Sequence, residues 1–320
     1  MDKKKIFITY DIPETGIQLL IKKGYAVEVY SGKKLISKSE LIKKVKNVDA
    51  VITLLTDKID NEVIDEMQRC KVIANYAVGY NNIDIEYAKR KGIIVTNTPN
   101  VLTDSTADLT MLLVLACMRR FNEGEKLMRS NKFEGWRPKL LLGYELKNKT
   151  FGIVGMGRIG YAVAKRAHAF GCKIIYYSNN RNVEAEQLLN ARRVSLPTLV
   201  RNSDIISLHI PLTPKTKNLL NKKLLSQMKN TSVLINTARG EVIDEKFLIS
   251  LLKRSKIFAA GFDVYENEPK VNPELLKLDN VVLLPHLGSA THEARNAMSE
   301  LAAKNVIAVL SGRKPLTPVY

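Results

Sequence analysis

Three side chains of complementary chemistry each follow an apolar run in the second half of the chain. Arg239 comes after "LINTA", Glu268 after "AAGF" and His286 after "VVLLP". An arginine fork can bind a carboxylate in two parallel hydrogen bonds and polarise the neighbouring carbonyl. A histidine can donate a proton to a carbonyl oxygen, and a nearby carboxylate would orient the ring and favour its imidazolium form. This set suits the reduction of a keto acid, for which a nicotinamide would supply the hydride.

Each of these residues also has a plainer interpretation. Arg239 could form a surface salt bridge, "ENEP" could be an acidic turn, and His286 could cap a helix. The order of the three on successive strands favours an active site, because ligands of open α/β sheets bind at the carboxyl ends of the strands.

A glycine pattern precedes these residues. Gly155, Gly157 and Gly160 form G-x-G-x-x-G between the strand "TFGIVG" and the helix "RIGYAVAKRAHAF". The first glycine permits a tight turn, the second lets a pyrophosphate approach the backbone, and the third lets the helix pack on the strand. In this context the pattern predicts a dinucleotide site at the helix N-terminus rather than a plain glycine-rich turn.

The next strand, "KIIYYS", ends at Ser178 without the acid that usually binds the ribose 2′-hydroxyl. Ser178 can donate a hydrogen bond to a 2′-phosphate, and Arg181 could supply a positive charge, while Asn179 supplies none. We therefore expect NADP to be preferred modestly, with NAD usable. The alternative is an ordinary polar turn with Arg181 in solvent.

The remaining histidines and the cysteines predict no metal site. His168 and His292 lie on expected helices and should be solvated, whereas His209 ends a strand and could line the coenzyme crevice. The three cysteines are far apart and form no C-x-x-C pair, so neither zinc nor a disulfide framework is indicated, and a reducing cytoplasm fits.

Short β-branched and aromatic runs alternate with amphipathic stretches throughout the chain, which predicts an α/β protein with two doubly wound parallel-sheet domains. A first series of expected strands covers residues 5–10, 25–30, 50–55, 71–77 and 92–98, and a second covers 150–155, 173–178, 204–211, 231–238, 257–264 and 280–286. A long helix should begin near Asp104, with an apolar stripe through Leu112, Leu115 and Met118, and residues 288–310 read as a last helix. At 320 residues the chain is long enough for two domains.

Composition excludes two classes of partner. The longest apolar run, Leu109 to Met118, is shorter than the roughly 20 residues that span a bilayer, so no membrane insertion is expected. The net charge of +18 raises nucleic acid as a partner, but the basic residues are spread along the chain without a recognised binding motif. A solvated surface that favours anionic substrates is the better interpretation.

The residues quoted above lie in longer motifs that resemble the D-isomer-specific 2-hydroxyacid dehydrogenase family over essentially the whole chain. The motifs are "ANYAVGYNNID", "VTNTPNVLTDSTADL", "GIVGMGRIG", "LINTARG", "GFDVYENEP" and "NVVLLPHLGSAT". Within the family, "ANYAVGYNNID" and "YYS" point to the branch of glyoxylate and hydroxypyruvate reductases, archaeal ones above all. Asn82 departs from a frequent aspartate at that position.

The resemblance implies a discontinuous layout. A flavodoxin-like substrate domain would comprise residues 1–98 and 289–320, and a Rossmann coenzyme domain residues 99–288, with a cleft between them. The long helix after Pro99 would form a homodimer interface.

The resemblance also assigns site residues. Arg239, Glu268 and His286 would form the active site, and Leu54 with the backbone amides of Val78 and Gly79 would bind substrate, together with Arg239. Coenzyme contacts would come from Thr106, Gly155, Gly157, Arg158, Ile159, Gly160, Ser178, Asn179, Arg181, Thr237, Ala238, Asp263 and Gly288.

The resulting expectation is NAD(P)H-dependent reduction of a small 2-keto acid, either glyoxylate or hydroxypyruvate. Phosphoglycerate dehydrogenase or another D-2-hydroxyacid dehydrogenase stays an alternative, favoured by the positive charge. A dinucleotide-sensing corepressor, which shares the fold, is a remote one.

Overall fold

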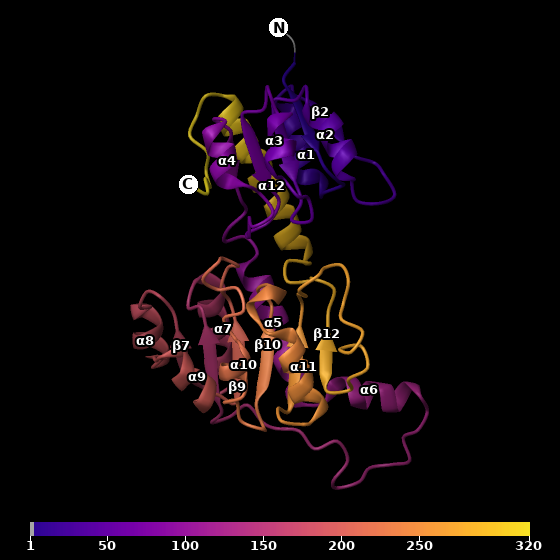
Figure 1. Cartoon of the computed structure of the whole chain (residues 1–320), viewed down its shortest axis with the longest axis vertical. Coiled ribbons are helices and arrows are strands. Elements are labelled where there is room, and N and C mark those ends of the chain that lie inside the picture. Colours follow the sequence, from indigo (N-terminus) through magenta and orange to yellow (C-terminus); the bar gives the residue numbers. More distant parts are fainter. Residues whose placement is uncertain (1–2) are drawn as a thin grey trace. The chain divides into compact units, whose positions relative to one another are not determined.

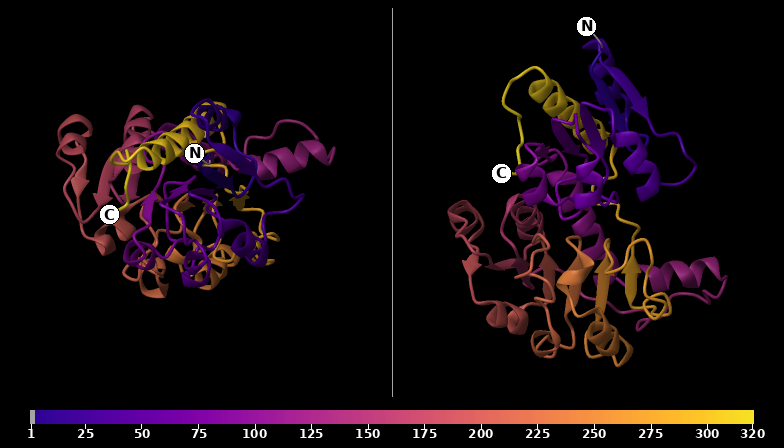
Figure 2. Two further views of the ribbon diagram at one scale, coloured as in Figure 1. Left: turned by 90° about the horizontal axis from the view of Figure 1, so that it is seen from above. Right: turned by 45° about the horizontal axis from the view of Figure 1, so that its top comes forward.

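The computed structural model describes residues 3–320, and the chain divides into two compact units. Unit 1 comprises Met1–Leu102 with Ala290–Tyr320, and unit 2 comprises Thr103–Ser289. Figures 1 and 2 show in unit 1 how the yellow C-terminal helix lies among the indigo and purple elements from the start of the chain. The chain divides after Leu102 and Ser289, whereas the sequence led us to expect boundaries after residues 98 and 288.

Unit 1 contains one five-stranded sheet, in which all neighbours are parallel and the order is β2-β1-β3-β4-β5. Its strands are β1 (Lys5–Ile8), β2 (Ala26–Val29), β3 (Ala50–Thr53), β4 (Val72–Asn75) and β5 (Ile94–Thr96). Its helices are α1 (Glu14–Lys22), α2 (Lys38–Val45), α3 (Asn61–Asp65), α4 (Ile85–Arg90) and α12 (His292–Leu310). This is the flavodoxin-like order, whose switch point lies between β1 and β3.

The sequence dictates these elements locally. Every residue of β3 and β4 is buried, as expected of apolar strands covered on both faces. Ser37 caps α2 in a capping box with Glu40, and the side chains of Asp60 and Asp84 cap α3 and α4. Helix α12 packs against α1 and β4, so the end of the chain completes the core of unit 1.

Unit 2 contains a seven-stranded parallel sheet in the order β12-β11-β10-β9-β6-β7-β8. Its strands are β6 (Thr150–Val154), β7 (Lys173–Tyr177), β8 (Arg192–Arg193), β9 (Ile205–Leu208), β10 (Val233–Asn236), β11 (Ala259–Phe262) and β12 (Val281–Leu283). Its helices are α5 (Thr103–Met118), α6 (Phe121–Arg129), α7 (Arg158–Ala169), α8 (Val183–Leu189), α9 (Leu196–Asn202), α10 (Lys222–Leu225), α11 (Glu245–Lys253) and the 3₁₀ turn η1 (Gly240–Val242).

The strand order of unit 2 is that of a doubly wound Rossmann sheet, extended by one strand. The order reverses between β6 and β9, and this switch point is where dinucleotides bind in such sheets. The two parallel sheets confirm the predicted fold class. The two-residue strand β8 was not predicted, because "RR" carries no apolar pattern.

Helix α5 lies against α7, β10 and β11 and begins within one residue of the expected Asp104. The expected apolar stripe is wrong at one position, because the side chain of Leu112 is 54% exposed while Met118 is 1% exposed. The core face of α5 is formed by Met111, Leu113, Val114, Cys117 and Met118. In the described part of the chain, no helix is both long enough and apolar enough to cross a membrane.

Candidate active site

The centre of the site is a hydrogen bond between His286 and Glu268, whose Nδ1 and Oε2 atoms are 2.8 Å apart. Both side chains are about three-quarters buried, with 27% and 29% of their surfaces exposed. Because Nδ1 is bound to the carboxylate, the opposite ring nitrogen, Nε2, is the one that can exchange a proton with a ligand. Burial alone would raise the pKa of Glu268, but the hydrogen bond and charge of His286 outweigh it and hold that pKa below its usual value.

The loop after β11 fixes the carboxylate of Glu268. Its Oε1 atom accepts a hydrogen bond from the Tyr265 backbone N–H at 2.9 Å, and the Tyr265 hydroxyl donates to the carbonyl of Leu284 at 2.8 Å. The loop also lies directly against Gly240, where an added Cβ would be 2.1 Å from the Glu266 nitrogen. The glycine of "ARG" is therefore required for the loop to approach the end of β10.

Arg239 follows β10 and is partly buried. Its Nη1 donates to the carbonyl of Ala238 at 2.7 Å, and its own carbonyl accepts from the side chain of Asn236 at 2.8 Å. Burial lowers the pKa of the guanidinium, while the negative charges of Glu268 and Glu241 oppose that effect. Arg239 and the pair of Glu268 with His286 are thus coupled electrostatically at one edge of the sheet.

His286 adopts a left-handed backbone conformation, with φ of 56°. Such a conformation costs a non-glycine residue about 1–3 kcal/mol and persists only where the surroundings enforce it. Here Asp263, which is 1% exposed, accepts hydrogen bonds from the N–H groups of Leu287 at 2.6 Å and Gly288 at 2.8 Å. Burial raises the pKa of the Asp263 carboxyl, against the effect of these donors. Asp263 therefore holds the turn that presents the histidine.

Hydrogen bonds join α5 both to this turn and to the end of β10. The hydroxyl of Thr106 donates to the carbonyl of Gly288 at 3.0 Å, and Thr110 links the same helix to Thr237, with the two hydroxyl oxygens 3.2 Å apart.

The glycine turn between β6 and α7 fits a dinucleotide. Gly155 has φ of 100°, and an added Cβ would be 2.5 Å from the carbonyl oxygen of His209. At Gly160 an added Cβ would be 2.0 Å from the Gly155 carbonyl oxygen, whereas at Gly157 it would meet nothing within 4 Å. Gly157 caps α7 without any side-chain hydrogen bond to the first helical N–H groups. Open space beside these groups suits a pyrophosphate, with the neighbouring Arg158 exposed and Ile159 partly buried.

At the end of β7, two arginines form contacts that were not predicted from the sequence. Ser178 is partly buried and Asn179 exposed, and Arg181 forms an ion pair with Glu186. Arg193, on β8, donates to the carbonyls of Ser178 at 3.1 Å and Asn179 at 2.7 Å.

In unit 1, the loop after β4 presents backbone groups. The carbonyl of Val78 accepts from the side chain of Asn97 at 2.8 Å, and that of Gly79 accepts from Asn75 at 2.8 Å. No hydrogen bond joins the N–H groups of Val78 and Gly79 to other residues in the 3–320 range. Because the two carbonyls are held by hydrogen bonds, the two neighbouring N–H groups are suited to bind an anion.

A buried polar network joins this loop to Leu54. The side chain of Asn82 donates to the carbonyls of Leu54 at 3.0 Å and Asp57 at 3.1 Å. The carboxylate of Asp57, itself 5% exposed, accepts from the Thr9 hydroxyl at 2.5 Å and the Leu54 N–H at 2.7 Å. Burial raises the pKa of Asp57, while those two donors partly offset the effect.

Of the other histidines, His168 and His292 are exposed, as expected. His209 is partly exposed at the end of β9, its Nε2 2.8 Å from the Ser207 hydroxyl, and burial of the ring lowers its pKa to about 3. Across the described residues, no group of three or more histidine, cysteine or acidic side chains is arranged to bind a metal.

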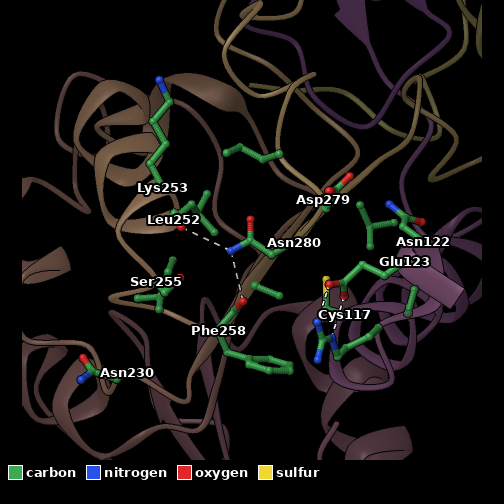
Figure 3. A pocket seen from close by; sticks show the side chains of 16 residues that line it. Cys117, Asn122, Glu123, Asn230, Leu252, Lys253, Ser255, Phe258, Asp279 and Asn280 are labelled. Carbon is green, nitrogen blue, oxygen red and sulfur yellow. Dashed lines mark hydrogen bonds and ion pairs between the residues drawn. The ribbon is translucent and has the colours of Figure 1, made fainter. Parts of the chain in front are cut away.

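A cavity of about 410 Å³ lies elsewhere in unit 2, where β11 and β12 begin. Figure 3 shows Asn280 reaching the carbonyls of Leu252 and Phe258. Arg120, which also lines the cavity, forms an ion pair with Glu123. Because these residues lie before β11 and β12 or on the helices packed there, the cavity is at the opposite end of the strands from His286 and is separate from the candidate site.

Several residues at the site escaped sequence reasoning. Asp57, Asn75 and Asn97 fix the loops of unit 1, and Glu186 and Arg193 lie at the end of β7. Asn75 and Asn97 did carry a usable signal, since a buried polar residue at the end of a buried strand, or directly after it, usually has a hydrogen-bond partner.

The chain is similar to known proteins over nearly its whole length. Residues 111–288 match the family model described as D-isomer specific 2-hydroxyacid dehydrogenase, NAD binding domain. The chain is 53% identical to a protein named glyoxylate reductase from Thermococcus litoralis, over 98% of this chain and 96% of that one.

Two crystal structures extend the comparison. One, of the TT0316 protein from Thermus thermophilus, has a TM-score of 0.93 and 43% identity, covering 99% of this chain and 100% of the other. The other is an NADPH-dependent glyoxylate/hydroxypyruvate reductase from Sinorhizobium meliloti, in complex with NADP and malonate. It has a TM-score of 0.87 and 32% identity, covering 99% of this chain and 97% of the other.

Proposed function

The chain belongs to the D-isomer specific 2-hydroxyacid dehydrogenase family, and from this premise we propose that it reduces glyoxylate, or hydroxypyruvate, to the 2-hydroxy acid. The observation that carries the proposal is the hydrogen bond between His286 and Glu268, beside Arg239 and on the same sheet as a glycine turn that fits a dinucleotide. The names of the relatives in Thermococcus litoralis and Sinorhizobium meliloti support glyoxylate as the substrate.

The chain's own residues would perform distinct tasks. Arg239 would bind the substrate carboxylate and polarise the adjacent carbonyl. His286 would donate the proton on Nε2 to the carbonyl oxygen, and Glu268 would hold the ring in that orientation and stabilise its positive charge. In unit 1, the N–H groups of Val78 and Gly79 would bind the carboxylate and Leu54 would contact the apolar side of the substrate. When bound, the nicotinamide supplies the hydride.

The coenzyme is a nicotinamide dinucleotide, and we propose a modest preference for NADPH over NADH. Gly155, Gly157, Gly160, Arg158 and Ile159 would hold the pyrophosphate at the start of α7. Thr106, Thr237, Ala238, Asp263 and Gly288 would surround the nicotinamide half. Ser178 supports the NADPH preference because it stands at the position after β7 that usually carries the acid that binds the ribose 2′-hydroxyl.

We also propose that two copies associate through α5, α6 and the segment after α6. These elements carry large exposed apolar side chains, among them Leu112 at 54%, Phe121 at 60%, Met128 at 61% and Trp136 at 81%. Figure 1 shows α6 and the following segment extending away from the sheet of unit 2, where they would be free to contact a second copy. Light scattering after size exclusion should give twice the mass of one chain, and a monomer would contradict the proposal.

Steady-state kinetics test the proposed reaction. Purified protein should oxidise NADPH, and more weakly NADH, with glyoxylate or hydroxypyruvate, and should prefer both to pyruvate and 3-phosphohydroxypyruvate. Absence of turnover with glyoxylate and hydroxypyruvate under both coenzymes would contradict it. A preference for 3-phosphohydroxypyruvate would identify a different member of the family.

A further inference from the structure

Two arginines lie at the end of β7, where dinucleotide folds read the adenine ribose. Arg181 lies four residues beyond the last residue of the strand, and its side chain is 64% exposed. Arg193 comes from β8, the neighbouring edge strand, and its guanidinium is bound to the carbonyls of Ser178 and Asn179. Both cations are therefore near a 2′-phosphate site, but their local partners differ.

Arg181 is occupied by a carboxylate. Its Nε is 3.1 Å from Oε2 of Glu186, and its Nη2 donates to the same oxygen. The other carboxylate oxygen of Glu186 accepts from the Tyr176 hydroxyl at 2.5 Å, so the glutamate is fixed on both sides. The Glu186 side chain, on α8 beside β7 (Figure 1), is only 18% exposed.

The two guanidinium groups differ in what they can still bind. A guanidinium has five N–H donors, and Arg193 uses its Nε and Nη2 atoms on backbone carbonyls, which carry no compensating charge. Arg181 instead directs its fork at a carboxylate, the partner a phosphate would have to replace.

We propose that Glu186 is a coenzyme-specificity residue: it withholds Arg181 from a 2′-phosphate and leaves Arg193 as the cation that binds that group. The inference rests on the proposed dinucleotide site, and it accounts for a preference for NADPH that is modest rather than strong. The hydrogen bond from Arg181 lowers the pKa of Glu186, so the carboxylate is ionised at neutral pH and also repels a phosphate directly.

Binding of two adenine nucleotides tests the proposal without any turnover. Adenosine 2′,5′-bisphosphate carries the 2′-phosphate and adenosine 5′-monophosphate lacks it, so the ratio of their dissociation constants, measured by titration calorimetry, isolates that group. In Glu186→Gln the amide oxygen can still accept from Tyr176 while Arg181 is released. We expect selectivity for the bisphosphate to rise about three- to tenfold, the range of one newly available charged contact.

A second substitution and a matched control separate release of Arg181 from a general change in charge. Adding Arg181→Ala to Glu186→Gln should remove the gain, whereas Arg181→Ala alone should change the selectivity little. Glu184→Gln removes the same charge from an exposed position on the same helix and should leave the selectivity unchanged. An unchanged ratio in Glu186→Gln, or an equal rise in Glu184→Gln, would overturn the role of Glu186.

The role of Arg193 has its own control. Arg193→Ala should lower the selectivity for the bisphosphate about three- to tenfold, while Arg192→Ala, which removes an exposed charge from the same strand, should not. Equal losses in both variants would overturn the assignment. Normal nucleotide binding without glyoxylate turnover would count against the proposed substrate alone, whereas failure of every variant and the wild type to bind either nucleotide would remove the coenzyme site and this proposal with it.

Discussion

The carboxyl ends of the two sheets are built in contrasting ways. In unit 2, this edge carries ionisable side chains whose hydrogen-bonding atoms are partly accessible, with His286, Glu268 and Arg239 as the central set. In unit 1, the acidic side chain, Asp57, is buried and accepts hydrogen bonds from Thr9 and Leu54, while the backbone N–H groups of Val78 and Gly79 have no hydrogen-bond partner among the described residues. In the proposed reaction, the edge of unit 2 would perform proton transfer and the edge of unit 1 would supply fixed donors for substrate binding.

The largest effect should follow removal of the proton donor from the edge of unit 2. His286→Asn keeps a polar side chain but cannot donate a proton as an acid, so kcat should fall about 1,000-fold, within the range of general acid catalysis. Coenzyme affinity, measured by NADPH fluorescence, should stay within about twofold because the glycine turn is untouched. A loss of kcat below about tenfold would contradict the role of His286.

Replacing the guanidinium of Arg239 by an ammonium group should have the next largest effect. Arg239→Lys retains the charge but loses the planar fork, so binding of the substrate carboxylate should weaken by about 100-fold in kcat/KM, chiefly through KM. The measurement is a substrate titration at saturating coenzyme. A kinetic profile equal to that of the wild type would exclude a carboxylate bound at Arg239.

Neutralising Glu268 should reduce kcat/KM by about 10- to 100-fold, because the ring of His286 loses its ionised partner.

The substitution Glu268→Gln should also change how the stability of the fold depends on pH. The pKa of Glu268 in the folded chain is below its ordinary value of 4.5, so its contribution to folding is complete above pH 4.5 and is lost as the pH falls through the lowered value. Urea unfolding should show a gap between wild type and Glu268→Gln at pH 7 that narrows under acid conditions.

Substitutions in the polar network of unit 1 should have smaller effects, and these should appear in substrate binding. Asn82→Asp replaces an amide that donates to two carbonyls with a carboxylate that would repel them. We expect KM for the keto acid to rise about three- to tenfold with kcat nearly unchanged, and stability to fall by about 1–3 kcal/mol. A fall in kcat as large as that of Glu268→Gln would break the contrast between the two edges.

The smallest effect should come from Asp57→Asn. The amide oxygen can still accept from Thr9 and Leu54, so kcat/KM should stay within about threefold of the wild type. Because the folded pKa of Asp57 lies above its ordinary value of 3.8, the carboxyl stabilises the fold fully below that pH and loses this contribution as the pH rises. The unfolding temperature of the variant should therefore rise relative to that of the wild type as the pH increases from 4 to 7.

The features that could be predicted from the sequence are those that depend on residue spacing along one strand or turn. The glycine pattern and the residues after β10, β11 and β12 could be placed because a parallel sheet gathers its strand ends at one edge. The exposure of Leu112 was not predicted, since helical periodicity alone does not say which of two apolar faces stays uncovered. The partners of Arg181 and Arg193 depend on how α8 and β8 return to β7, which a single sequence does not specify.

The contrast between the edges is tested most directly by measuring kcat/KM for glyoxylate and NADPH in Glu268→Gln and Asp57→Asn side by side. Both variants exchange one carboxylate for an amide of the same shape. We predict a loss of about 10- to 100-fold in Glu268→Gln and of no more than about threefold in Asp57→Asn. Equal losses in the two variants would contradict the assignment of proton transfer to the edge of unit 2 alone.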